Sequence, residues 1–288
     1  MNTGMVIHAR GLRKRYGRTV ALDGLDLDME EGEVLCLLGP NGAGKTTTVE
    51  ILEGYRRRDA GEALVLGQDP ERAGASWRAR RGVVLQSCED VVELTVSECV
   101  RHFACFYPSP AGPAEVIDRV GLSSKAGSRI RSLSGGQRRR LDVALGIVGQ
   151  PELLFLDEPT TGFDPEARRL FWNVVRRLAD AGTSILLTTH YLEEAEALAS
   201  RVAVVNHGRV VAVGPPAELG GRQHAPAKVS WLGPNGWQHE QTHQPAALVR
   251  QLAETFGGEV PGLTVTRPTL EEIYLGLIGE GVAEEGSQ

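Results

Sequence analysis

The stretch Gly39-Pro40-Asn41-Gly42-Ala43-Gly44-Lys45-Thr46 decides the fold of this chain. It fits the phosphate-binding loop G-x-x-x-x-G-K-[ST], in which backbone N–H groups surround the phosphates of a nucleotide. The apolar run 34–38 before it predicts a buried strand, and residues 47–52 predict the opening of a helix. A strand, a glycine-rich turn and a helix N-terminus together direct unpaired N–H groups at an anion. The sequence therefore predicts a nucleoside triphosphate site.

Two side chains of this loop have predicted roles toward the nucleotide. Lys45 would reach the β- and γ-phosphates, and the Thr46 hydroxyl would hold Mg²⁺. The remaining expected contacts share the loop or its helix start and are Gly39, Pro40, Asn41, Gly42, Ala43, Gly44 and Thr47. The alternative is a glycine-rich turn without a ligand, which the Lys-Thr ending and the preceding strand disfavour.

A carboxylate pair follows a second buried apolar run. Residues 153–156 end at Asp157, and Glu158 comes next. Phosphoryl transfer needs a metal-side carboxylate at the end of a strand beside the phosphate loop. We therefore expect Asp157 to orient Mg²⁺ through its water shell. Glu158 would accept a proton from the water that attacks the γ-phosphate. Without the upstream loop, a strand end with two solvated charges would be the better interpretation.

Polar residues also end two other buried strands. Gln86 follows residues 83–85, and His190 follows residues 186–189. Ligands of an open α/β sheet lie beyond the carboxyl ends of its strands. Gln86 is therefore a candidate contact of Mg²⁺ or of the attacking water, and His190 of the γ-phosphate. Each position also fits an ordinary strand cap.

A second glycine-rich helix start, Leu133-Ser134-Gly135-Gly136-Gln137, also offers N–H groups and a hydroxyl to an anion. Generic phosphate-loop enzymes do not need it. The chain closely resembles the ATP-binding subunit of ABC transporters in the order of its motifs. These are the phosphate loop, Gln86, this segment, residues 153–160, Gly162-Phe163-Asp164 and His190. The resemblance covers roughly residues 5 to 220.

The resemblance implies a P-loop NTPase fold of the ABC ATPase type, with ATP and Mg²⁺ as cofactors. It also implies a head-to-tail homodimer, in which residues 134–137 of one subunit face the γ-phosphate held by the other. Tyr16 matches the aromatic residue that stacks on adenine, although an isolated Tyr more often packs. Asp164 matches the loop that links the two sites. Phe163 stands where Leu is more usual, a departure that concerns packing rather than chemistry.

Alternating apolar strands and helices predict an α/β fold with a mainly parallel sheet. Residues 1–30 predict short antiparallel strands, and about 88–150 form the helical subdomain. We expect an ATP-binding domain over 1–220 and a small α+β accessory domain over 221–288. Within the latter, Gly233-Pro234-Asn235-Gly236 repeats the start of the phosphate loop, lacks its Gly-Lys-Thr ending and predicts a turn.

The segment 267–274 resembles the C-terminal part of drug- and antibiotic-resistance exporter ATPases of the daunorubicin-resistance type. The same residues also fit a plain helix, capped by Thr269 and carrying Glu271 and Glu272 in its first turn.

Composition limits the partners. The net charge of −6 over 288 residues gives no overall basic field, so we expect no nucleic-acid partner, and the run 138–140 is interpreted mainly as a solvated face. Apolar runs fall short of the ~20 residues that cross a bilayer, and a secretion signal is not evident. We therefore expect the chain at the cytoplasmic face of the cell membrane, held by membrane-spanning permease subunits.

The four cysteines, at positions 36, 88, 99 and 105, include no C-x-x-C pair. Cys36 precedes the phosphate loop and predicts a small buried apolar residue. Cys99, His102 and Cys105 share one side of a predicted helix, but three such residues without a fourth make a poor zinc site. We expect neither a metal site nor a disulfide here.

The leading hypothesis is an ATP-hydrolysing pair that energises export of drug, antibiotic or lipid-like cargo through separate permease subunits, which dock between Gln86 and Tyr107. One alternative is a soluble ATPase of the same superfamily that works on ribosomes, DNA or cluster assembly. Such proteins often carry two nucleotide modules or a long coiled-coil insertion, which this chain lacks. Another is an ATP-gated regulatory module, which the presence of Glu158 and His190 disfavours.

Overall fold

The computed structural model describes residues 4–84 and 93–283. The chain divides into two compact units, one from Met1 to Val211 and the other from Ala212 to Gln288. A domain boundary near residue 220 stays a prediction.

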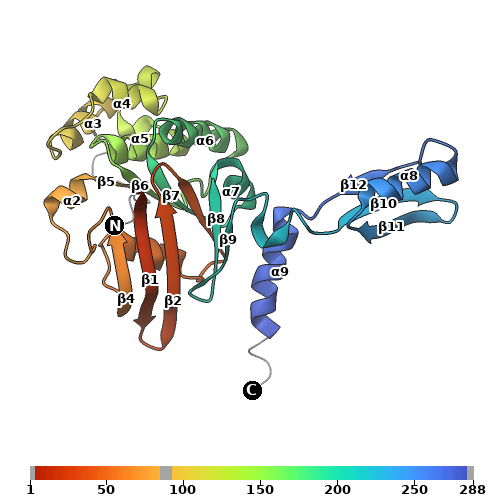
Figure 1. Ribbon diagram of the computed structural model, residues 1–288. Helices are drawn as coiled ribbons and strands as arrows, with labels where there is room; N and C mark the ends of the chain where they lie inside the picture. Colours follow the sequence, from red (N-terminus) through yellow and green to blue (C-terminus); the bar gives the residue numbers. More distant parts are fainter. Residues whose placement is uncertain (1–3, 85–92, 284–288) are drawn as a thin grey trace. The chain divides into compact units, whose positions relative to one another are not determined.

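A six-stranded sheet in the order β5-β6-β7-β3-β8-β9 forms the centre of the first unit (Figure 1). Its strands are β3 (Val34–Leu38), β5 (Arg81–Val84), β6 (Leu153–Asp157), β7 (Ser184–Thr189), β8 (Arg201–Asn206) and β9 (Arg209–Gly214), and the division between the two units falls within β9. The pairs from β5 to β8 are parallel. Every residue of β3 and β7 is buried. Such continuous apolar strands are typical of a parallel sheet covered on both faces.

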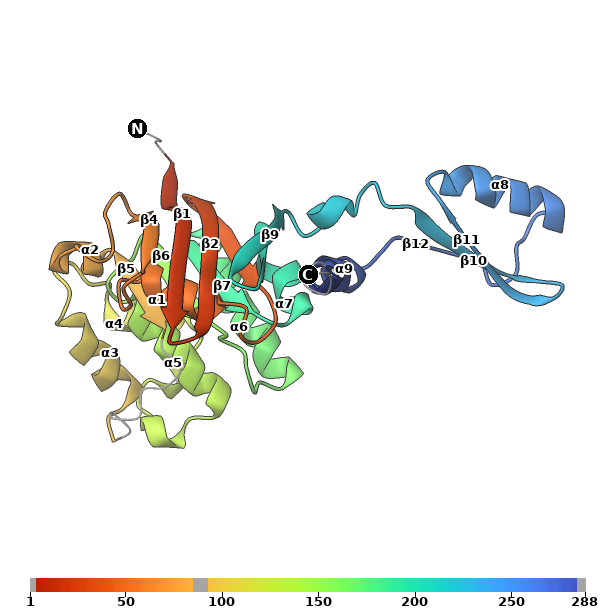
Figure 2. The same cartoon turned by 90° about the horizontal axis from the view of Figure 1, so that it is seen from below.

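Three antiparallel strands form a second sheet, in the order β2-β1-β4 (Figures 1 and 2). They are β1 (Met5–Tyr16), β2 (Thr19–Glu30) and β4 (Ala60–Val65). The expectation of short N-terminal strands was wrong, because β1 and β2 run for 12 residues each. Bulges along their pairing keep the apolar side chains on one face despite this length. That face packs into one core with residues of β3, β6 and α1.

Seven helices connect the strands in the described part of the first unit. They are α1 (Lys45–Leu52), α2 (Ala75–Ala79), α3 (Val96–Ala104), α4 (Pro113–Arg119), α5 (Gly135–Ile147), α6 (Pro165–Asp180) and α7 (Leu192–Leu198), with 3₁₀ turns at Ser123–Lys125 and Ile130–Ser132. Helices α3, α4 and α5 pack on one another beside the sheet (Figure 1). No helix of the described residues has the length and apolar character of a bilayer span.

The second unit is a small α+β structure, as predicted. Its sheet has the order β11-β10-β12. The elements are a 3₁₀ turn (Leu219–Gly221), β10 (Ala227–Gly233), β11 (Gly236–Thr242), α8 (Pro245–Phe256), β12 (Thr264–Thr266) and α9 (Leu270–Ala283). Residues 233–236 form the hairpin turn between β10 and β11. Thr269 caps α9, since its hydroxyl accepts a hydrogen bond from the Glu272 N–H at 3.1 Å.

Three cysteines lie in the described residues. Cys36 is buried in β3, Cys99 is buried in α3 and Cys105 is exposed. Burial raises the pKa of the Cys36 thiol, so this side chain stays protonated and packs as an apolar group.

Candidate functional site

The phosphate loop connects β3 to α1 and depends on glycine at two close approaches. A Cβ atom on Gly39 would lie 2.3 Å from the Val205 carbonyl oxygen. Gly44 has φ 106° and precedes the first helical residue, and a Cβ atom there would lie 2.6 Å from the Ala21 carbonyl oxygen. Side chains are excluded at both positions, so the loop wraps tightly over the start of α1.

Lys45 lies inside this loop and is only 4% exposed. Its Nζ donates hydrogen bonds to the carbonyl oxygens of Gly39 at 2.9 Å and Pro40 at 3.1 Å. The same atom lies 3.5 Å from Oε1 of Glu158. A buried ammonium group held by oxygen atoms is thus fixed at the inner wall of the loop, beside the predicted base.

Thr46 and Asp157 come together from α1 and the end of β6. The Thr46 hydroxyl lies 3.5 Å from Oδ1 of Asp157, and the Thr188 hydroxyl also donates to that oxygen. Hydroxyl and carboxylate oxygens are the donors that Mg²⁺ prefers. The residues present therefore fit the predicted metal, and Thr188 fixes the carboxylate.

Glu158 has an unusual backbone, with φ 42° in the left-handed region. For a residue with a side chain this conformation costs about 1–2 kcal/mol. Thr188 of the neighbouring β7 stabilises it, because the Glu158 N–H donates to the Thr188 carbonyl at 3.2 Å and hydroxyl at 3.0 Å. Two hydrogen bonds from the neighbouring strand thus hold the Glu158 backbone in this conformation.

His190 follows β7 and lies beside the Glu158 carboxylate. Its Nδ1 is 3.4 Å from Oε2 of Glu158. The imidazole ring stacks on Tyr191 with a centroid distance of 4.1 Å. The structure therefore brings Lys45, Glu158 and His190 to one place, while Gln86 lies outside the described residues.

Ser134 begins α5 as half of a capping box. Its hydroxyl accepts from the Gln137 N–H at 3.3 Å, and the Gln137 side chain accepts from the Ser134 N–H at 3.0 Å. Gly136 passes so close to α6 that a Cβ there would lie 3.1 Å from the Ala167 Cβ. Asp164 caps α6 by accepting from the Ala167 N–H at 2.8 Å. Ser134, Gly136, Gln137 and Asp164 line one small pocket.

Comparison with known proteins decides the family. The family model described as ABC transporter matches residues 22–161. The daunorubicin resistance ATP-binding protein DrrA3 of Streptomyces coeruleorubidus is 39% identical, over 94% of this chain and 95% of that protein. The chain belongs to the ABC transporter family.

Two further relatives agree with this assignment. The Nod factor export ATP-binding protein I of Ralstonia nicotianae is 37% identical, over 95% of this chain and 94% of that protein. Among solved structures, cbiO1 from Clostridium perfringens, part of the ABC transporter complex cbiONQ, is 25% identical with a TM-score of 0.68, covering 75% and 90% of the two chains. These relatives are ATP-binding subunits of exporters, and the chain is an ABC ATPase.

Two residues of this ABC ATPase that sequence reasoning did not assign to the site contact its backbone. Thr188 directly follows the apolar residues 185–187, and Arg139 lies in a run of three arginines that was interpreted mainly as a solvated face. That interpretation was wrong for Arg139, which is buried. Arg139 lies in α5, within which all residues from 141 to 147 are also buried, so the helix carries the guanidinium inward. No local signal distinguishes Arg139 from Arg138.

Tyr16 and Phe163 have different surroundings. Tyr16 is exposed at the end of β1, with Nζ of Lys14 5.8 Å and Cζ of Arg56 5.1 Å from its ring centroid. An exposed ring flanked by cations suits an adenine nucleotide. Phe163 packs edge-on against the buried Phe171 at 6.0 Å, in keeping with a packing role.

Proposed function

We propose that this chain is the Mg²⁺-dependent ATP-hydrolysing subunit of an exporter, and that Glu158 is its general base. The observation that carries the proposal is the meeting of Lys45, Glu158 and His190 at the carboxyl ends of β3, β6 and β7. Three separate chain segments meet here, with the Lys45 ammonium 3.5 Å and the His190 imidazole 3.4 Å from the Glu158 carboxylate. Such a set suits the hydrolysis of a phosphoanhydride.

Each residue has a defined task in this proposal. Lys45 and the loop N–H groups bind and orient the β- and γ-phosphates. Thr46 and Asp157 would hold Mg²⁺, which neutralises charge on the phosphate oxygens when bound. Glu158 takes one proton from the attacking water, and His190 keeps the Glu158 carboxylate and the γ-phosphate in line. Gln86 stays a proposed contact of the metal or water.

We also propose that the site is completed by a second copy of the chain. Ser134, Gly136, Gln137 and Asp164 line a pocket that, among the described residues, includes none of the phosphate loop. An anion-binding helix start that does not face its own nucleotide suits a nucleotide held by a neighbour. Gly135 shares that helix start. In two chains arranged head-to-tail, the phosphate loop of one chain and the α5 start of the other would face the same nucleotide. Tyr16 of each chain would lie on the adenine.

The membrane partner would dock on α3. His102 and Phe103 of this helix form an aromatic cluster with Phe106, which lies just beyond the end of α3, with centroid distances of 5.9, 5.3 and 6.0 Å. Phe106 is 69% exposed. An exposed aromatic cluster fits the apolar face of a permease's cytoplasmic helix and would hold the chain at the cytoplasmic side of the membrane.

The cargo we propose is a drug, an antibiotic or a lipid-like molecule. The names of the relatives, which include daunorubicin resistance and Nod factor export, support this class. The domain plan we propose has the ATP-binding domain in residues 1–220, with the helical subdomain at about 88–150, and the accessory domain in 221–288.

The substitution Glu158→Gln tests the catalytic assignment. It should keep ATP affinity and lower kcat by at least about 100-fold, because a general base contributes about 10²–10⁴ in rate. Sizing chromatography with ATP should show a trapped dimer, whereas Lys45→Met should bind no nucleotide and stay monomeric. Hydrolysis at the wild-type rate in Glu158→Gln would refute the base assignment.

Capture from detergent-solubilised membranes separates an exporter subunit from a soluble ATPase. The wild-type chain should retain a protein with several membrane-spanning helices, identified by mass spectrometry. Phe106→Ser should lose it, while Val20→Ser, which removes another exposed apolar side chain (46% exposed) from β2, should keep it. Failure of the wild type to retain any membrane protein would favour the soluble ATPase.

A further inference from the structure

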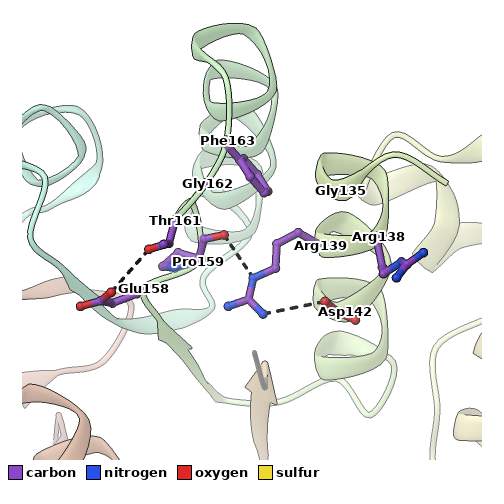
Figure 3. A pocket seen from close by; sticks show the side chains of 9 residues that line it. All are labelled: Gly135, Arg138, Arg139, Asp142, Glu158, Pro159, Thr161, Gly162 and Phe163. Carbon is purple, nitrogen blue, oxygen red and sulfur yellow. Dashed lines mark hydrogen bonds and ion pairs between the residues drawn. The ribbon is translucent and has the colours of Figure 1, made fainter. Parts of the chain in front are cut away.

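Arg139 lies in a pocket between α5 and the segment that carries Glu158 (Figure 3). The residue is 7% exposed, although it belongs to a run of arginines directly after the α5 start. A guanidinium group cannot lose its charge in a protein, so its burial requires hydrogen-bond acceptors. The acceptors show what this side chain does.

Two of those acceptors flank the proposed base. Nε of Arg139 donates to the Pro159 carbonyl at 3.1 Å, and Nη2 donates to the Asp157 carbonyl at 3.1 Å. Between these carbonyls lies Glu158, whose φ of 42° is unfavourable for any residue with a side chain. The planar guanidinium therefore bridges the carbonyls before and after the strained residue, and the Thr188 hydroxyl accepts a hydrogen bond from the Glu158 N–H.

Asp142 fixes the guanidinium in turn. It lies three residues further along α5, and its Oδ2 is 3.8 Å from Nη1 of Arg139. Both side chains are buried, and Figure 3 marks the ion pair between them with a dashed line. Lysine at position 139 would keep the charge but could not present a planar pair of donors to both carbonyls.

We propose that Arg139 is a positioning residue that sets the direction of the Glu158 carboxylate by holding the carbonyls on both sides of it. This inference rests on the proposed role of Glu158 as the base. Because Ser134 caps the N-terminus of α5, the same helix both offers its start to the partner's nucleotide and holds the base of its own site.

The test compares Arg139→Met and Arg139→Lys with the wild type. Arg139→Met should keep the Kd for ATP within about twofold and lower kcat by about 10- to 100-fold, because small misplacements of a catalytic group cost rate rather than binding. Arg139→Lys, which keeps the buried charge, should have a kcat between those of the wild type and Arg139→Met.

A matched control separates positioning from a general loss of stability. Arg201, at the start of β8, pairs with the buried Glu33 at 3.2 Å, at the end of the sheet opposite to the site. Arg201→Met should lower Tm as Arg139→Met does, yet keep kcat. If the two variants lose kcat equally, the positioning role is overturned.

A double-mutant cycle gives the decisive measurement. When Glu158→Gln has removed the base, adding Arg139→Lys should lower single-turnover hydrolysis no further, because there is no base left to position. A further loss by the same factor as in the wild-type background would overturn the proposal. Wild-type hydrolysis by Glu158→Gln alone would instead refute the proposed base, so the two failures are distinguishable.

Discussion

Glu53 should make the stability of the first unit depend on pH near neutrality. It follows α1, is 8% exposed and lines a pocket together with Thr46, Asp157 and Arg81. Burial raises the pKa of Glu53 from its ordinary 4.5 to about 7, and the charge of Arg81 offsets this only in part. The perturbation is Glu53→Gln, which keeps the shape of the side chain but cannot ionise.

The direction of this pH dependence follows from the ionisation of Glu53 in the unfolded and in the folded chain. Below pH 4.5 Glu53 is protonated whether the chain is folded or unfolded, and the full stability is present. As the pH rises, the unfolded chain ionises first, so the folded state loses stability until the pH passes the folded pKa. A pKa of about 7 in place of 4.5 corresponds to a loss of about 2.5 kcal/mol between pH 5 and pH 8.

Urea unfolding of wild type and Glu53→Gln at pH 5, 6, 7 and 8 measures this loss. Replacing Trp231 and Trp237 by Phe in both proteins leaves the fluorescence of Trp77 and Trp172, which report on the first unit. The free energy of unfolding of the variant, relative to wild type, should rise by about 2.5 kcal/mol from pH 5 to pH 8. A constant difference across the four pH values would refute the reasoning.

Two further substitutions test the nucleotide contact and the core. Tyr16→Ala should weaken ATP binding by about tenfold in calorimetric titration, since stacking of an aromatic ring on a base is worth about 1–3 kcal/mol, and Tyr16→Phe should retain it; equal affinity of all three proteins would remove Tyr16 from the site. Trp77→Phe should lower the free energy of unfolding by about 1–3 kcal/mol, because the hydrogen bond from the buried Trp77 Nε1 to the Val65 carbonyl at 2.7 Å would be lost and the smaller ring would leave a cavity. A loss below about 0.5 kcal/mol in urea unfolding would contradict this account.

Local sequence was enough for much of the fold and of the candidate site. The loop 39–46 needs glycine where its backbone closely approaches another backbone segment, so its conformation could be predicted from its residue types. Apolar runs of strand length predicted β3, β6 and β7, and the polar residues at their ends gave Asp157, Glu158 and His190. Because the carboxyl ends of parallel strands lie at one edge of the sheet, residues that follow β3, β6 and β7 in the sequence could be expected to lie close together.

The length of β1 and β2 and the roles of Thr188 and Arg139 could not be predicted. The bulges in the β1–β2 pairing shift the alternation of apolar and polar residues, so the local sequence pattern underestimates the length of both strands. Thr188 and Thr189 both end β7 with a hydroxyl, and only the fold shows that the Thr188 hydroxyl reaches Asp157, which is 31 residues away in the chain.

The sequence by itself was enough to predict a nucleoside triphosphate site, the carboxylates beside it and the family to which the chain is similar, because these features depend on residue type and spacing. The tertiary structure alone decided which of three consecutive arginines faces inward, because helix rotation is set by packing and not by spacing. It thereby placed the Arg139 guanidinium on the two carbonyls that flank Glu158.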